Sequence, residues 1–331
     1  MSLVPTIYDY ADAGAPALTG QAGSLNALLR ACLVTGYGSG SSAKPPAGWT
    51  EPFPSSGNVA VFRNSVIEGS GTHLRVDDSG AGAAGLRAAV VKSYKSMSEL
   101  STGIDVAPNP ALFTGELQWI KSATLDGMSR PWWAIANSRA LYLFTAEGLA
   151  AGEEKPYAAL DLISHKPGDA YPFWLAGVTG YMSGTHGSGG TNGFYRTSAT
   201  MDANDTLSNG AWLTRRHDAA AGAVRAQFNR DREAAGSSGQ YGGLGQIAYP
   251  DPVSGGLLCG RLYVKEGAGI IRGRLPGLRI PYHNRPFADR ALIEDATGLP
   301  AFRAKNFNLW SNTSAPMQMG QLLFDTGVDW L

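Results

Sequence analysis

An alternation of apolar and polar residues runs through most of this chain. Leu74 and Val76, for example, flank Arg75, and Val59 and Val61 flank a small residue, while Leu141 and Leu143 alternate with the aromatic Tyr142 and Phe144. A period of two places the alternate side chains on one face of an extended strand. Strands are therefore expected at Val59–Val61, Leu74–Val76, Leu86–Tyr94, Leu117–Trp119, Trp132–Ala136, Leu141–Phe144, Tyr157–Ile163, Tyr171–Val178, Ala211–Leu213, Val224–Phe228, Gly245–Tyr249, Leu258–Val264, Ile270–Leu275 and Leu322–Phe324.

Turn residues separate these short segments, as in Asp126-Gly127 and Pro167-Gly168-Asp169. Short strands joined by such turns are typical of antiparallel pairing. The sequence thus predicts a mainly β fold of antiparallel sheets, arranged as a sandwich or a barrel, at the margin of the α+β class.

One segment has the spacing of a helix instead. Leu25, Leu28, Leu29, Cys32 and Leu33 recur at three- and four-residue intervals, which places them on one helical face. Ser24 is positioned to cap the start and Gly36 to end the helix. We expect this face to pack into the core.

The organisation into domains has two readings. Gly184–Gly193 lacks apolar periodicity and predicts a surface loop or a boundary. Residues 1–183 are then a β-rich domain containing the helix, and 194–331 are either a second β-rich domain or a continuation of the first. The apolar end, with Trp330 and Leu331, predicts a docked C-terminus.

Composition and charge exclude some partners. The chain has 331 residues with 27 Lys plus Arg and 27 Asp plus Glu, so no net field attracts nucleic acid or anionic membranes. Only 16% of the residues are charged, which suits either a surface covered by neighbouring subunits or a turn-rich β protein with high Ala and Gly content. No signal peptide or membrane-spanning run is visible, so synthesis in a cytoplasm is expected.

The two cysteines, Cys32 and Cys259, lie among apolar residues. Both are interpreted as small buried hydrophobic side chains, and a disulfide between them stays open.

Residue patterns that carry chemistry are missing from the sequence. The five histidines lack the close spacing of zinc ligands, and the adjacent Asp77 and Asp78 favour a turn cap over an acid/base pair. Asp202, Asn204 and Asp205 lack the register of a calcium loop. Because no nucleophile elbow or phosphate loop is present either, we predict no catalytic, cofactor-binding or metal site.

Several phrases occur in an order that resembles one protein family. Pro5–Phe53 opens as PTIYDYADAGAPALTGQAGSLNALLRACLVTGYGS and continues to AGWTEPF. The later phrases are AVFRN (Ala60–Asn64), HLRVDDSG (His73–Gly80), RPWWAIANSRALYLF (Arg130–Phe144), DLISHKPGDAYPFWLAG (Asp161–Gly177) and IIRGRLPGLRIPYH (Ile270–His283). The chain is similar in these phrases to uncharacterised structural proteins encoded among the head and tail genes of tailed bacteriophages.

This resemblance implies a place in a virion and no catalytic residue. It leads us to expect a symmetric homo-oligomer that contacts other virion proteins in the neck, tail or baseplate, with a decoration protein on the capsid surface as the alternative. A receptor- or glycan-binding tail protein is the rival class, because exposed aromatic rings stack on sugars, and a tail-borne cell-wall hydrolase is a third. The aromatic residues near predicted loops that suggest glycan binding are Trp49, Trp132, Trp133, Trp174, Tyr181, Tyr195, Trp212 and Tyr241.

Four residues are candidates for contacts with partners. Arg272 and Arg274 are two residues apart in a predicted strand that ends at Pro276-Gly277, so both guanidinium groups are expected on one face. Such a pair suits the carboxylates of a partner subunit. Trp212 and Trp330 are candidate aromatic anchors.

Overall fold

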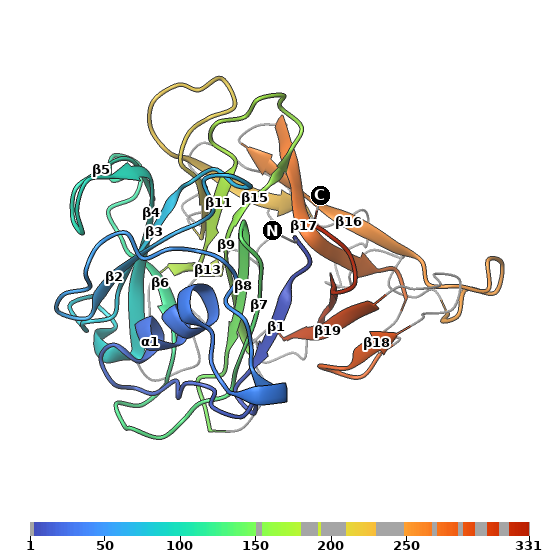
Figure 1. Cartoon of the computed structure of the whole chain (residues 1–331). Helices are drawn as coiled ribbons and strands as arrows, with labels where there is room; N and C mark the ends of the chain where they lie inside the picture. Colours follow the sequence, from blue (N-terminus) through green and yellow to red (C-terminus); the bar gives the residue numbers. More distant parts are fainter. Residues whose placement is uncertain are drawn as a thin grey trace.

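The computed structural model describes residues 3–149, 154–179, 191–192, 210–229, 248–266, 270–283, 287–294, 303–310 and 318–330. Within these ranges the chain is mainly antiparallel β sheet, with one α-helix near the N-terminus (Figure 1). The predicted fold class is confirmed.

A sheet of 13 strands among the described residues runs through the molecule. Its strands follow the order β1-β7-β8-β9-β11-β14-β15-β16-β17-β20-β19-β18, and β10 pairs with β17 at the side. Their bounds are β1 Thr6–Asp9, β7 Trp132–Ala136, β8 Ala140–Thr145, β9 Lys155–Asp161, β10 Ile163–Ser164, β11 Phe173–Ala176, β14 Ala211–Leu213, β15 Val224–Asn229, β16 Cys259–Glu266, β17 Ile270–Pro281, β18 Leu292–Glu294, β19 Arg303–Trp310 and β20 Gln318–Asp325.

A second sheet, of seven strands in the described part, has the order β13-β12-β6-β4-β3-β2, with β5 paired to β4. The strands are β2 Val59–Arg63, β3 His73–Asp77, β4 Ala88–Met97, β5 Gly103–Ala107, β6 Leu117–Ile120, β12 Val178–Thr179 and β13 Thr191–Asn192. The helical segments are α1 Ser24–Arg30, a π-helical turn Ala31–Thr35 and two 3₁₀ turns, Gly40–Ser42 and Gly85–Arg87.

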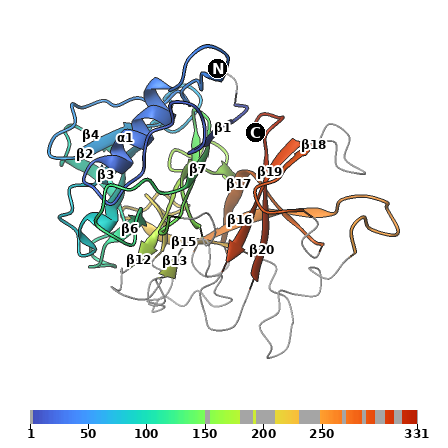
Figure 2. The same cartoon turned by 90° about the horizontal axis from the view of Figure 1, so that it is seen from below.

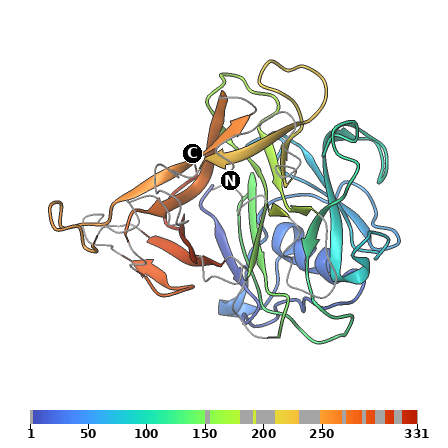
Figure 3. The same cartoon turned by 180° about the vertical axis from the view of Figure 1, so that it is seen from behind.

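The strands β7, β8, β9 and β11 are buried on both faces. One face contributes Leu143 and Leu175 to a core shared with α1 and the smaller sheet. The other face contributes Tyr142 and Trp174 to a core shared with β16, β17, β19 and β20. Seen from below and from behind, these green strands lie between the blue and cyan strands on one side and the orange and red strands on the other (Figures 2 and 3). Burial on both faces explains why these strands are apolar at nearly every position.

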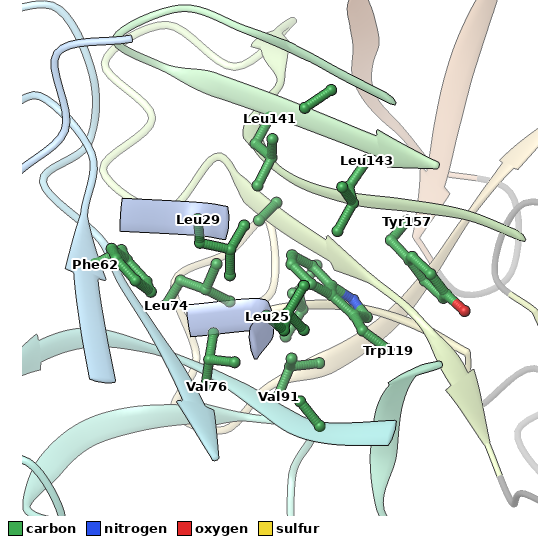
Figure 4. Close-up of a cluster of buried hydrophobic side chains, with 14 of the residues drawn as sticks. Leu25, Leu29, Phe62, Leu74, Val76, Val91, Trp119, Leu141, Leu143 and Tyr157 are labelled. Carbon is green, nitrogen blue, oxygen red and sulfur yellow. The ribbon is translucent and has the colours of Figure 1, made fainter. Parts of the chain in front are cut away.

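The helix packs into the first core as predicted. Leu25, Leu28, Leu29, Cys32 and Leu33 are all fully buried. Leu25 and Leu29 face side chains of the smaller sheet on one side and Leu141 and Leu143 of β8 on the other (Figure 4). Gly36 ends the helical segment, since its φ of 74° leaves the helical region.

The prediction that Ser24 caps the start of α1 is wrong. Gly23 occupies the N-cap position, and the Ser24 hydroxyl donates to the carbonyl of Thr19. The cap comes instead from Asp78, whose Oδ2 accepts the backbone N–H of Leu25 at 2.8 Å. Asp78 thus acts as a cap, but of a helix distant in sequence, a contact that local spacing does not reveal.

Most of the predicted strands are present, with three kinds of difference. The strands β1, β5, β18 and β19 were not predicted, because they are short, polar or both. The strand predicted over Gly245–Tyr249 falls largely outside the described residues, and its described end, Ala248–Tyr249, is not in a strand. The predicted loop Gly184–Gly193 also lies outside them, except for Thr191 and Asn192, which form β13.

The C-terminus is docked, as expected. Trp330 is buried in the second core, and its indole N–H donates to the Asp325 carbonyl at 2.8 Å. The backbone N–H of Leu3 donates to the Asp329 carboxylate at 2.8 Å, so the two ends of the described chain meet (Figure 1). Cys32 is buried, whereas Cys259 is only half-buried, and both thiols are free.

Candidate functional site

The two candidate arginines of β17 do not share a face. Val264 of β16 pairs with Gly273, but the next residue, Lys265, pairs with Ile271, so Arg272 is an extra residue in a β-bulge. A bulge changes the direction of a side chain without ending the strand. The prediction that Arg272 and Arg274 lie side by side on one face is therefore wrong.

Arg272 is directed into the molecule. It is 1% exposed, and its guanidinium donates to both oxygens of Asp169 at 2.7 Å and to Glu266 at 2.8 Å. Burial opposes its charge, but these hydrogen bonds outweigh that effect and raise the pKa of Arg272. The N–H donors of the Arg272 guanidinium are thus used inside the chain. Arg272 forms internal ion pairs and is not a contact for a partner.

The Arg272 ion pairs tie two loops to β17. Asp169 belongs to the loop between β10 and β11, and Glu266 accepts the backbone N–H of His217 at 2.8 Å from the loop between β14 and β15. Lys166 of the first loop donates to the His217 carbonyl at 2.6 Å. These loops lie next to each other at the upper end of β17 in Figure 1. The arrangement fixes the positions of the two loops relative to β17.

Arg274 belongs to a different surface, which we name the arginine face: Arg261, Tyr263, Arg274 and Arg279. Arg261 pairs directly with Arg279 across β16 and β17, and Tyr263 pairs with Arg274. Since Leu262 and Val264 point into the second core, the alternate residues Arg261 and Tyr263 point to the opposite side. This side is exposed at Tyr263, but Leu323, the partner of Arg279 in β20, is buried there in a third cluster. Register therefore gathers three arginines on one face.

The pairing of β16 with β17 has a second irregularity, between the Arg261–Arg279 pair and the Tyr263–Arg274 pair. One residue of β16, Leu262, lies opposite Leu275–Leu278 of β17. Gly277 adopts a φ of 65°, so the chain bends there and the strand continues to Pro281. The predicted end of the strand at Pro276-Gly277 is thus wrong, and the continuation is what brings Arg279 opposite Arg261.

The arginines of this face differ in their pairing. Nε of Arg279 lies 3.0 Å from both carboxylate oxygens of Asp325, a residue of β20. Arg261 has neither a hydrogen-bond nor an ion-pair partner among the residues that the structure describes. Partial burial, followed by repulsion from Arg274 and Arg279, lowers the pKa of Arg261. Like charges directly opposite on a sheet disfavour the pair, and the Asp325 carboxylate partly offsets this repulsion.

The arginine face contains one aromatic residue, Tyr263, and is bordered by other aromatic and apolar groups. Tyr263 is 37% exposed, and the exposed His165 meets it edge to face at a ring distance of 5.7 Å. Ile163 of β10 pairs with Arg274 from the other side, and the exposed Ile271 follows at the bulge. The face thus combines guanidinium groups with apolar contact area, a composition found at protein interfaces.

Both candidate tryptophans lie inside the chain. Trp212 is fully buried in the first core beside Phe113, and the guanidinium of Arg225 lies over its ring. Trp330 packs in the second core against Tyr142. Each is an anchor of this chain's own core, so neither is available to a partner, which corrects their assignment as interface residues.

The remaining aromatic candidates give no exposed sugar platform within the described residues. The tryptophans near predicted loops are buried, namely Trp49, Trp132, Trp133, Trp174 and Trp212. Tyr181, Tyr195 and Tyr241 lie outside the described residues, as do Asp202, Asn204 and Asp205. In the part of the chain that the structure describes, no group of three His, Cys, Asp or Glu side chains is placed to hold a metal, and no helix is long and apolar enough to cross a membrane.

Sequence reasoning missed Arg261 and Arg279. A signal for Arg261 was present, because Arg261, Tyr263 and Lys265 are the polar alternates of a predicted strand whose apolar residues point inwards. Arg279 lies beyond the predicted end of β17 and had no such signal. No protein-family model matches this chain, and no curated protein matches it either.

Proposed function

We propose that this protein is a structural component of a tailed-bacteriophage particle and acts through contacts with other virion proteins. The observation that carries the contact role is the arginine face, where three arginines lie on one side of the sheet with the exposed Tyr263 and beside the exposed Ile271. The resemblance of the sequence phrases to virion proteins supports the place of action. Neck, tail or baseplate is the first choice of location, and the capsid surface is the alternative.

A rigid scaffold suits this role. The central strands are anchored in two cores, and Arg272 holds two loops against β17 through buried ion pairs. A preorganised surface loses little conformational entropy when a partner binds. We further propose that several copies assemble symmetrically, as in most soluble oligomers.

The proposal is tested on purified particles of the phage that carries this gene. Mass spectrometry should detect the chain in stoichiometric amount, and electron microscopy of particles with a labelled copy should place the label at a fixed position. Particles that lack the protein yet remain infectious would refute the proposal.

Catalysis is tested separately. We expect His165→Ala and His283→Ala to leave infectivity unchanged when the variants are incorporated in full amount. Asp169→Ala is not an equivalent variant, because it leaves the buried Arg272 without its bidentate partner. Full incorporation of a histidine variant into non-infectious particles would favour a catalytic or receptor-contacting role.

A further inference from the structure

The side chains of Lys121 and Asp78 meet in the interior, beside the start of α1. Lys121 directly follows β6 and Asp78 directly follows β3, and the two residues are 43 positions apart in the sequence. Both side chains are fully buried, and Nζ of Lys121 contacts Oδ1 of Asp78. The backbone N–H of Lys121 donates to the Arg87 carbonyl at 2.9 Å, and that of Asp78 donates to the Asn58 carbonyl at 3.0 Å. An amine and a carboxyl group are thus held in contact, an arrangement that makes a reaction between them effectively unimolecular.

We propose that Lys121 and Asp78 form an intramolecular isopeptide bond between Nζ and Cγ in the folded protein. In this reaction the unprotonated Nζ attacks Cγ of the protonated carboxyl group, and the new N–C bond replaces the bond from Cγ to Oδ1. Oδ1 leaves as water, with its own hydrogen and one hydrogen from Nζ. No oxidant, reductant or further reactant is consumed. The inference goes beyond the proposed function, because it concerns a covalent bond within the chain.

Burial favours the protonation states that this reaction needs. In water at neutral pH both groups are charged, and neither an ammonium group nor a carboxylate reacts in this way. Desolvation in the interior raises the pKa of Asp78 and lowers the pKa of Lys121. Transfer of one proton from Nζ to Oδ1, along the existing contact, yields the neutral amine and the neutral acid. The amide is also neutral, so its formation removes two charges from an environment that opposes both.

The hydrogen bonds around the pair suit both the reaction and its product. The backbone N–H of Leu25 donates to Oδ2 of Asp78 at 2.8 Å, so it stabilises the negative charge that develops on this oxygen when Nζ attacks Cγ. In the product, Oδ2 is the carbonyl oxygen of the amide and still accepts this hydrogen bond. Nζ keeps one hydrogen for the Gln21 carbonyl, which it already contacts. The product gives up only the longer contact of Nζ with the Ser24 hydroxyl, at 3.3 Å.

The bond would connect strands that are not neighbours in the smaller sheet. β3 and β6 lie on either side of β4, so a bond between the residues that follow them ties three adjacent strands together. It also fixes the carboxyl oxygen that caps α1. A cross-link of this kind restricts the unfolded chain and thereby favours the folded one.

Mass spectrometry of the purified full chain tests the inference. The bond removes one water, so the denatured wild-type protein should be about 18 Da lighter than an unmodified chain. Trypsin should no longer cleave after Lys121, and the tryptic peptide 76–87, which contains Asp78, should be joined to the peptide that contains Lys121. Fragmentation of the linked peptides should place the bond on these two side chains.

Two variants serve as references. Lys121→Arg keeps the cation but cannot form the amide, so it should have the full mass of its sequence. Lys155→Arg is the matched control, because Lys155 and Glu147 are another largely buried pair, but Nζ of Lys155 lies 3.8 Å from Oε1 of Glu147 and is not in hydrogen-bonding contact with it. Lys155→Arg should therefore lose one water, as the wild type does.

A wild-type protein with the full mass of its sequence would overturn the inference. So would a loss of water that Lys121→Arg retains, or one that the peptide map places elsewhere, for example as a cyclic imide at Asp126-Gly127. The wild-type measurement decides the question even if a variant does not fold. Because it is made on the isolated chain, its outcome is independent of whether phage particles contain the protein.

Discussion

Burial gives single residues properties that the sequence alone does not indicate, and His73 is the clearest case. Its side chain is 4% exposed in β3 and stacks on Phe53. Desolvation, followed by the nearby charges of Arg63 and Lys95, lowers the pKa of His73 from 6.5 to about 4. His73 is therefore neutral in the folded protein under conditions where it titrates in the unfolded chain.

The pH dependence of stability follows from this difference. Between pH 6.5 and about 4 the unfolded chain binds a proton at His73 that the folded protein does not, so stability from this residue is present above pH 6.5 and falls as the pH drops. The full loss amounts to about 3 kcal/mol. We expect urea unfolding of the wild type to lose more stability than His73→Phe between about pH 7 and pH 4.5. Parallel pH profiles of the two proteins would show that His73 does not titrate in this way.

Gly277 is a second residue whose role depends on a distant contact. Its φ is 65°, and a Cβ at this position would collide with the indole of Trp330. Gly277→Ala combines backbone strain with displacement of a core tryptophan, so a loss of about 2 kcal/mol or more is expected. Thermal unfolding measures it, and Gly168→Ala, at positive φ but with open space around it, separates strain from collision. Equal losses in the two variants would rule out the contact with Trp330 as the cause.

At the scale of elements, α1 depends on a buried ion pair from the smaller sheet and the segment after β6. Lys121 and Asp78 have fully buried side chains and form an ion pair, and Lys121 also contacts Ser24 at the start of the helix. Desolvation raises the pKa of Asp78 and lowers that of Lys121, each against the effect of the partner. Burial thus opposes both charges, and their mutual contact offsets it.

Removing one partner should therefore cost more than removing both charges. Lys121→Met leaves the Asp78 carboxylate buried without its cation, and a loss of about 3–5 kcal/mol is expected. Asp78→Asn combined with Lys121→Met should recover part of this loss, because Asn also accepts a hydrogen bond at a helix start. Urea denaturation followed by circular dichroism provides the comparison. A double variant less stable than Lys121→Met would contradict the explanation.

At the scale of the whole molecule, the central strands connect both halves. Adjacent residues of β8 serve different cores, since Leu143 belongs to the first core and Phe144 to the second. Loss of packing in either core therefore weakens the same strands. We expect this coupling to make unfolding cooperative across the chain.

Calorimetry tests the coupling. Leu143→Ala in the first core and Leu160→Ala in the second should each cost about 2–5 kcal/mol and lower one common transition. Tryptophan fluorescence and circular dichroism should report the same midpoint. Two transitions, each moved by only one of the variants, would instead indicate separately folding halves.

The sequence by itself determined the local elements of this protein. Alternating apolar residues predicted most strands, and helical spacing predicted the buried face of α1, because both patterns depend on neighbours within a few residues. For the candidate site, the sequence predicted Arg274 and a strand face that carries more than one arginine.

The tertiary structure decided which side chains meet. Arg272 turns inwards because a bulge in β17 interrupts the alternation, and Arg261 faces Arg279 because β17 continues through Gly277. Asp78 caps α1 across more than 50 residues of sequence. Pairing register, bulges and long-range caps depend on which strands become neighbours, and that choice is set by burial of the whole chain and not by any local spacing.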